Sequence, residues 1–96
     1  ATTILENTIY RIRMLEIQPS KSLSLQCHQQ RSEHWVVLEG TADVQRGDEK
    51  VILQKNESAF IPKGMNHRLG NSGDTTLKII EVQQGEYLGE DDIERF

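Results

Sequence analysis

Four side chains with metal-binding donors stand at short, regular spacings: Gln26, His28, Glu33 and His67. Gln26 and His28 are two residues apart, so on a β-strand both side chains leave the same face. Glu33 opens the next apolar segment, and His67 follows the turn at residues 61–64. Nitrogen and oxygen donors without a thiolate suit zinc above all, and also manganese, iron, nickel or cobalt. The spacing therefore predicts one divalent cation held inside a small β-barrel.

The rest of the chain predicts the strands that must position these donors. Short apolar alternations separated by turn signals are typical of antiparallel β structure. Helical periodicity is limited to residues 89–96. Strands of this length within 96 residues predict a single all-β domain with a jelly-roll barrel. We expect a first strand from residue 10 that stops near residues 18–20, and further strands at residues 23–28, 35–38, 41–45, 50–53, 58–61, 67–69 and 75–82, with a hairpin turn at 46–49.

The order of the donor residues resembles the two motifs of the cupin superfamily, HxH, Glu, Gly and then PxG, His, Asn. The chain ends its first motif with Gly40 and its second with Asn71. Gln26 stands where the first histidine is usual, and a Gln-x-His first motif resembles the phosphomannose isomerases. The resemblance implies the cupin form of the barrel, a double-stranded β-helix.

Longer segments resemble the type II phosphomannose isomerase domain over roughly residues 9 to 96. They are LSLQCH at 23–28, RSEHWVV at 31–37, EVQ at 81–83 and YLGEDDIERF at 87–96. In that family the domain is commonly the C-terminal half of a bifunctional enzyme whose other half is mannose-1-phosphate guanylyltransferase. The resemblance implies a metal-dependent isomerase that interconverts mannose 6-phosphate and fructose 6-phosphate.

The expected ligand set suits this chemistry. A neutral amide, two imidazoles and one carboxylate leave a bound zinc ion with a net positive charge of about one. Such an ion can hold adjacent sugar oxygens and stabilise the negative charge of an enediolate. The reaction then needs one base that moves a proton between neighbouring carbons.

Glu81 is the expected base. It shares strand parity with Leu77, Ile79 and Gln83, so it lies near the metal if that face lines the barrel. A structural role as the partner of an arginine is an equal alternative. The acidic residues 91–92 are a further choice if the tail folds over the mouth of the barrel.

The phosphate group requires a cation. Arg31 and Arg95 lie in the segments that most resemble the family, so we expect Arg31 to bind substrate and Arg95 to act in the catalytic site. Lys21 and Ser24 are further substrate-binding candidates, and Lys63 and Arg68 are alternatives for the phosphate.

Several neighbours of the ligands are expected to be structural. His34 follows Glu33 directly and therefore points to the opposite face, where it packs or meets an interface. Trp35 is expected in the core or the pocket wall, and Cys27 in packing on the far face of its strand. Asn71 is interpreted first as a turn residue.

Charge and composition narrow the classes of function. The net charge of −4 comes from the acidic tail, residues 85–96, because the other residues carry equal numbers of acidic and basic side chains. No basic stripe is present to neutralise a nucleic-acid backbone, and no apolar run is long enough to span a membrane. One cysteine excludes an internal disulfide and favours the cytoplasm.

Three functions stay open at this point. The first is the sugar-phosphate isomerase, as a homodimer paired through a strand edge. The alternative is a non-catalytic metal- and sugar-phosphate-binding or dimerising module detached from a guanylyltransferase, favoured by family segments that are lacking at both ends. The third is a cupin of another chemistry, such as an oxygenase.

Overall fold

Ten β-strands form two antiparallel five-stranded sheets in the part of the chain that the structure describes. The computed structural model describes residues 2–6, 10–23, 25–85, 88 and 94–95, except for the side chains of residues 5, 6, 94 and 95. The strands are β1 (Thr2–Glu6), β2 (Tyr10–Ile17), β3 (Gln26–Cys27), β4 (Arg31–Glu39), β5 (Ala42–Arg46), β6 (Glu49–Leu53), β7 (Ser58–Ile61), β8 (His67–Gly70), β9 (Leu77–Gly85) and β10 (Glu94–Arg95).

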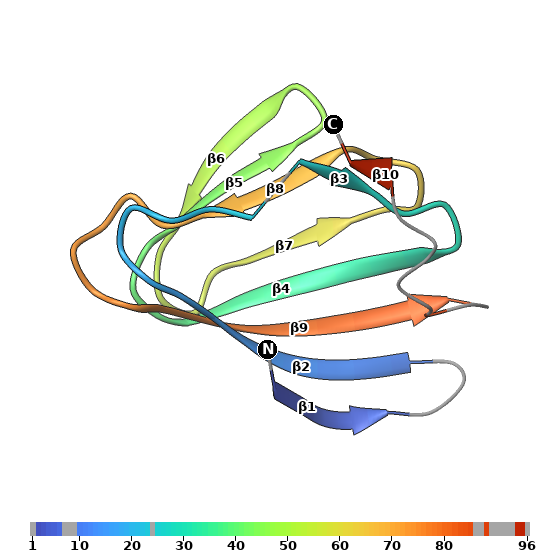
Figure 1. Ribbon diagram of the computed structural model, residues 1–96, viewed down its shortest axis with the longest axis horizontal. Coiled ribbons are helices and arrows are strands. Elements are labelled where there is room, and N and C mark those ends of the chain that lie inside the picture. The colour runs from blue at the N-terminus through green and yellow to red at the C-terminus, as the bar shows by residue number, and fades with distance from the viewer. Residues whose placement is uncertain (1, 7–9, 24, 86–87, 89–93, 96) are drawn as a thin grey trace.

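The two sheets face each other across the interior of the barrel (Figure 1). The longer sheet has the order β1-β2-β9-β4-β7, and the shorter sheet has the order β10-β3-β8-β5-β6. Strands that are distant in the sequence are therefore neighbours, as in a jelly roll. Among the described strands, β1 and β7 are the outermost of the longer sheet and β10 and β6 of the shorter one, and the homodimer expected through a strand edge stays a prediction.

The longer sheet buries every second residue of β4 and β9. The inward residues of β4 are Arg31, Glu33, Trp35 and Val37, and those of β9 are Leu77, Ile79, Glu81 and Gln83. This is the alternation expected of a sheet with one solvated face. The interior is apolar near one end, around Val37 and Ile79, and polar near the other, so a core and a site share one barrel.

The first expected strand is confirmed as β2, which ends at Ile17 and pairs with β9 along its whole length. Other elements differ from the strands expected: β1 was not predicted, and β4 begins at Arg31 rather than at Trp35. Of the expected strand at residues 23–28, the structure has β3 at Gln26 and Cys27, which pair with β8 and β10. The helical interpretation of residues 89–96 is wrong at Glu94 and Arg95, which pair with β3 as a strand; residues 89–93 and 96 lie outside the described part.

Two glycines allow turns that a side chain would obstruct. Gly40 has a φ of 87°, and a Cβ at this position would lie 3.1 Å from Leu77 Cα. Gly64 has a φ of 76°, and its N–H donates to the His28 carbonyl at 2.8 Å. Glycine adopts such positive φ values without steric cost. The turn at residues 62–64 therefore fixes the backbone of a candidate ligand.

Asn71 locks the loops at the end of the barrel away from the metal-binding motif. Its side chain is buried, and Nδ2 donates to the carbonyls of Ile17 at 2.9 Å and Thr75 at 2.8 Å. Its Oδ1 accepts from the N–H of Gly73 at 2.9 Å. Within the described residues, no helix has the length and apolarity needed to cross a bilayer.

Replacement of Asn71 by alanine should lower the free energy of unfolding by about 1–3 kcal/mol, because the buried carbonyl of Ile17 and the carbonyl of Thr75 lose their donor. Chemical denaturation monitored by tryptophan fluorescence measures the change. Asn66→Ala, at an exposed position, is the control and should stay within about 0.5 kcal/mol of the parent. Equal stability of the two variants would show that Asn71 does not hold the loops.

Candidate metal centre

The polar end of the barrel is built from two rows of residues across the longer sheet. In the first row, Arg11 of β2 pairs with Gln83 of β9, which pairs with Glu33 of β4. The second row is paired in the same way and consists of Arg13 and Trp35, two positions later on β2 and β4, with Glu81, two positions earlier on the antiparallel β9. Because paired residues on one face lie about 5 Å apart, each row is a continuous line of side chains.

His28, Glu33 and His67 form a buried cluster whose potential ligand atoms all lie within 4.8 Å of one another. The Nε2 of His28 is 3.6 Å from Glu33 Oε2, and the Nε2 of His67 is 3.6 Å from Glu33 Oε1. The two imidazole rings stack with a centroid distance of 5.4 Å. Each of the three residues is less than 5 % exposed. Glu33 comes from β4 of the longer sheet, His67 begins β8 of the shorter sheet, and His28 directly follows β3.

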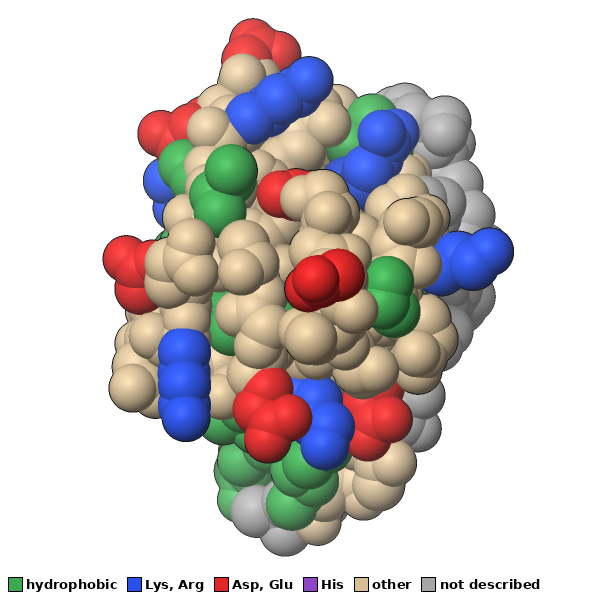
Figure 2. All heavy atoms as spheres, turned by 90° about the vertical axis from the view of Figure 1, so that its left-hand side faces the viewer, with side chains coloured by type: hydrophobic (Ala, Val, Ile, Leu, Met, Phe, Trp, Pro, Cys, Tyr) green, Lys and Arg blue, Asp and Glu red, His purple; other side chains and the backbone are tan. Residues whose placement is uncertain are grey.

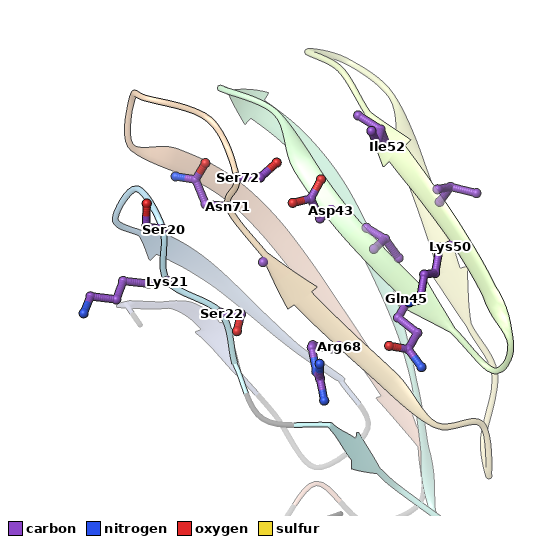
Figure 3. A pocket seen from close by; sticks show the side chains of 13 residues that line it. Ser20, Lys21, Ser22, Asp43, Gln45, Lys50, Ile52, Arg68, Asn71 and Ser72 are labelled. Atoms are coloured by element: carbon purple, nitrogen blue, oxygen red, sulfur yellow. The ribbon is translucent and has the colours of Figure 1, made fainter.

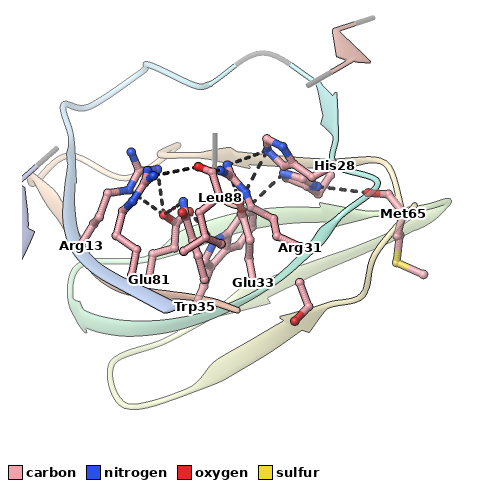
Figure 4. A network of polar contacts seen from close by, with 12 residues as sticks. Arg13, His28, Arg31, Glu33, Trp35, Met65, Glu81 and Leu88 are labelled. Atoms are coloured by element: carbon pink, nitrogen blue, oxygen red, sulfur yellow. Dashed lines mark hydrogen bonds and ion pairs between the residues drawn. The ribbon is translucent and has the colours of Figure 1, made fainter. Parts of the chain in front are cut away.

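The local structure orients the imidazole of His67. His67 Nδ1 lies 3.1 Å from the Met65 carbonyl, which as an acceptor requires a proton on Nδ1 and leaves the lone pair on Nε2 toward Glu33 (Figure 4). Gln26 is the cross-strand partner of His67, so both side chains leave the same face of their sheet. The structure thus brings all four expected ligands to one region, with Gln26 half-buried beside the cluster.

Burial sets the protonation of this cluster. Burial, together with the neighbouring Glu81 carboxylate, raises the pKa of Glu33 to about 8, although Arg31 acts to lower it. Burial lowers the pKa of His67, against the opposing effect of its hydrogen bond to Met65. A neutral imidazole is the form that binds a metal, whereas Glu33 must release a proton when a cation binds.

Arg31 supplies the positive charge beside Glu33. Its Nε donates to Glu33 Oε2 at 3.0 Å, and its Nη2 lies 3.0 Å from the same oxygen. Nη2 is also 2.9 Å from His28 Nε2. The guanidinium therefore contacts the atoms that would ligate a cation, and a metal ion must displace it from His28.

Glu81 lies in the second polar row and accepts hydrogen bonds from three side chains. Its Oε1 accepts from Arg13 Nε at 2.9 Å and from Gln83 Nε2 at 2.6 Å, and Arg13 Nη2 is 2.8 Å away. Its Oε2 accepts from Trp35 Nε1 at 3.2 Å. The face of Glu81 lines the barrel, and its contacts include Arg13, an arginine partner that was not expected.

Leu88 contacts Arg11 and Arg31 at the polar end of the barrel, which is called its mouth below. Its carbonyl accepts from Arg11 Nη2 at 2.8 Å and from Arg31 Nη1 at 3.5 Å. Leu88 is itself 7 % exposed. Figure 4 shows it between Glu81 and Arg31, so this residue closes the polar layer from above.

Other expected site residues lie elsewhere. The structure does not bring Lys21 to the cluster of His28, Glu33 and His67, because the bridge between Ser22 and Gly70 holds its segment beside the end of β8. Lys21 lines a separate cavity of about 700 Å³ together with Arg68 (Figure 3). Arg68 directly follows His67 and therefore leaves the opposite face of β8. Lys63 is exposed. Ser24, Asp91, Asp92 and the side chain of Arg95 lie outside the described residues.

His28, Glu33 and His67 do not lie at the end of the barrel where Asn71 holds the loops. Figure 2 views this end, where acidic and basic side chains alternate and none of the three histidines is visible. His34 is exposed on the outer face of β4 and contacts Phe60 edge-on at a centroid distance of 6.3 Å. Its expected outward orientation is confirmed. Cys27 is 3 % exposed, as expected for a packed residue.

Arg11, Arg13 and Gln83 were not predicted as site residues. Arg11 and Arg13 alternate with apolar residues, and this pattern alone does not say which set points inward. Leu15 and Ile17 lie on the same face of β2 as Arg11 and Arg13 and are buried core residues. These two apolar residues were the sequence feature that indicates an inward orientation of the arginines.

The chain resembles known proteins over nearly its whole length. The family described as mannose-6-phosphate isomerase C-terminal matches residues 1–96. The xanthan biosynthesis protein XanB of Xanthomonas campestris pv. campestris (strain B100) is 52 % identical over 87 residues, which are 91 % of this chain and 19 % of that protein. The mannose-1-phosphate guanylyltransferase of Sinorhizobium fredii is 49 % identical over 94 residues, 98 % of this chain and 18 % of that protein. The chain thus spans about a fifth of the length of these relatives.

Solved structures agree with the fold. A Klebsiella pneumoniae protein described as having a double-stranded β-helix domain superposes with a TM-score of 0.85, over 97 % of this chain and 79 % of that protein, at 19 % identity. The all-β architecture expected from the sequence is therefore confirmed. This chain belongs to the mannose-6-phosphate isomerase C-terminal family and has the double-stranded β-helix fold of the cupins.

Proposed function

We propose that this chain is a metal-dependent isomerase domain that interconverts mannose 6-phosphate and fructose 6-phosphate. The observation that carries the proposal is the convergence of His28, Glu33 and His67 within 4.8 Å, beside a second buried carboxylate and three arginines. Family membership supports the same substrate class. Gln26 is the fourth proposed ligand, and zinc is the ion that this donor set fits best.

The geometry of the cluster fits a cation. Ligand atoms about 2.1 Å from a tetrahedral ion lie about 3.4 Å from one another. The distances of 3.6 Å from Glu33 to each imidazole are close to this value. Metal binding at His28 would end its contact with Arg31 Nη2, and a phosphate oxygen is an anionic acceptor for the same guanidinium group.

The residues around the cluster can carry out the isomerisation. A bound divalent ion supplies a Lewis acid that polarises the sugar oxygens on carbons 1 and 2. Glu81 is the proposed base, acting through Oε2, whose hydrogen bond from Trp35 is longer than those received by Oε1. This oxygen would take the proton from carbon 2 of mannose 6-phosphate and return it to carbon 1. The proton of the carbon-2 hydroxyl would pass to the oxygen on carbon 1, which leaves the carbonyl group at carbon 2.

Phosphate recognition is assigned to Arg31, with Arg11 as its neighbour at the mouth and Arg95 as a further proposed contact. Arg11 and Arg31 already direct N–H groups to one carbonyl oxygen, that of Leu88. A phosphate oxygen would be a stronger acceptor for the same guanidinium groups. Because the metal cluster is almost fully buried, an incoming ligand must displace this carbonyl.

A non-catalytic metal-binding module is the second candidate. Glu81 is engaged by Arg13, Gln83 and Trp35, and the cluster is less than 5 % exposed. Both features also suit a metal ion that stabilises the domain without turnover. Activity with the metal restored distinguishes the two functions.

Metal binding should depend on His28, Glu33 and His67 and not on a histidine outside this cluster. We expect one zinc ion per chain in the parent, and affinity about 100-fold lower or worse in His28→Ala and Glu33→Gln, because removal of a ligand costs more than the 10- to 100-fold loss seen for outer partners. Isothermal titration calorimetry and elemental analysis measure affinity and occupancy.

His34→Ala is the matched control for metal binding, since His34 lies on β4 next to Glu33 but points outward. It should bind zinc as the parent does. An equal loss in this control, or unchanged affinity in His28→Ala and Glu33→Gln, would contradict the proposed centre.

Replacement of the proposed base should separate binding from turnover. Glu81→Gln should retain the metal but lower kcat by about 10²- to 10⁴-fold, because the amide cannot accept the substrate proton. A coupled assay for fructose 6-phosphate, run with and without a chelator, measures the change. Glu16→Gln, exposed on β2, is the control. An unchanged kcat in Glu81→Gln would end the assignment of the base, and a metal-loaded parent without turnover would favour the module.

A further inference from the structure

Gln83 has a buried oxygen that is not used by the fold. The side chain is fully buried on β9, and its Oε1 has no hydrogen-bond donor within the described part of the chain. A buried acceptor without a partner is destabilising, so native proteins rarely retain one without a bound water or ligand. The oxygen is therefore a candidate contact for a molecule that enters the barrel.

The direction of this oxygen is fixed by the other end of the amide. Gln83 Nε2 donates to Glu81 Oε1 at 2.6 Å. Exchange of the two amide atoms would place two oxygens at that distance, which is repulsive because neither can donate. Arg13 in turn holds Glu81 Oε1 through two nitrogen contacts. The hydrogen-bond network thus presents Oε1 of Gln83 as an acceptor in a single orientation.

The position of Gln83 places this acceptor next to the metal centre. Gln83 pairs with Glu33 on one side and with Arg11 on the other, and all three face the interior of the barrel. Paired residues on one face lie about 5 Å apart. A ligand with one oxygen at the cluster of His28, Glu33 and His67 therefore has its neighbouring groups within reach of Gln83.

The chemistry of the surroundings indicates the ligand class. Glu81 and Gln83 offer acceptors, so the matching group must be a donor, and the hydroxyl groups of a polyol can donate here while their neighbours bind the metal. We propose that Gln83 Oε1 accepts a hydrogen bond from a hydroxyl group of the sugar phosphate and thereby selects for the polyol chain. This inference rests on the proposed function, because it names the recognition element of the same site.

The test compares two changes in binding affinity: the change when one hydroxyl group is removed from the ligand, and the change when the amide of Gln83 is removed from the protein. Mannitol phosphate has no carbonyl group to isomerise, so its binding to the zinc-loaded protein can be measured by calorimetry independently of turnover. Gln83→Met, which keeps the length of the side chain, should weaken its binding about 3- to 10-fold through loss of one hydrogen bond. One of its monodeoxy derivatives should bind to the parent and to Gln83→Met equally well.

Two further variants keep the result interpretable. Gln84→Met makes the same change at the next residue, which is exposed on the outer face of β9, and should bind every ligand as the parent does. Gln83→Asn keeps an amide but withdraws it by one methylene, and it replaces Gln83→Met if that variant does not fold. It should bind mannitol phosphate more weakly than the parent does and should bind the same monodeoxy derivative equally well. Zinc content should be unchanged in all three variants.

Several results would overturn the role of Gln83. The first is that Gln83→Met loses the same affinity for every monodeoxy derivative as for mannitol phosphate itself. The second is that Gln83→Met loses no affinity for any of these ligands. The third is that the parent does not bind mannitol phosphate. A complex in which Oε1 contacts only a buried water would do the same. If the parent isomerises sugar phosphate but Gln83→Met binds every ligand normally, the proposed function stands without this contact. If the hydroxyl dependence is found without turnover, the contact stands and the isomerase does not.

Discussion

Two buried carboxylates, Glu33 and Glu81, govern the polar half of the barrel. A carboxylate removed from water is costly unless charged groups or donors replace the lost hydration. Arg31 contacts Glu33 in this way, and Arg13 with Trp35 and Gln83 contacts Glu81. Loss of either arginine would leave the carboxyl group that it contacts without its cationic partner in the interior. The arrangement of the remaining site follows from these two pairs.

The site is assembled from both sheets, and each supplies a different chemistry. Adjacent strands of the longer sheet provide the carboxylates and guanidinium groups in two rows. The imidazoles come from the shorter sheet and its neighbourhood: His67 begins β8, and His28 directly follows β3. The N–H of Gly64 holds the carbonyl of His28, and the carbonyl of Met65 orients His67. The proposed metal ion would connect the two sheets at this end of the barrel. The apolar core at the other end needs no such ion.

Sequence reasoning succeeded where alternation and motif spacing carry the information. The strict alternation of β4 and β9 predicted the inward orientation of Glu33 and Glu81 and the outward orientation of His34. The spacing of His28, Glu33 and His67 predicted a cluster that the structure brings together. These features are local or repeat with a period of two, so a single sequence is sufficient to identify them.

The remaining features depend on contacts between distant segments. The ion pair of Arg13 with Glu81 joins residues 68 positions apart, and only the register of β2 against β9 reveals it. Lys21 is separated from the cluster by the path of the chain after β2, which no local pattern specifies. The strand at residues 94–95 forms because β3 offers it an edge, which overrides the helical pattern of the tail.

X-ray absorption spectroscopy of the zinc-loaded protein tests the central claim most directly, because it reads the atoms around the ion. The account predicts nitrogen and oxygen neighbours at about 2.0–2.1 Å, with the multiple scattering of two imidazoles and no sulfur. A sulfur neighbour near 2.3 Å, which only Cys27 or a methionine could supply, or the absence of imidazole scattering, would contradict it.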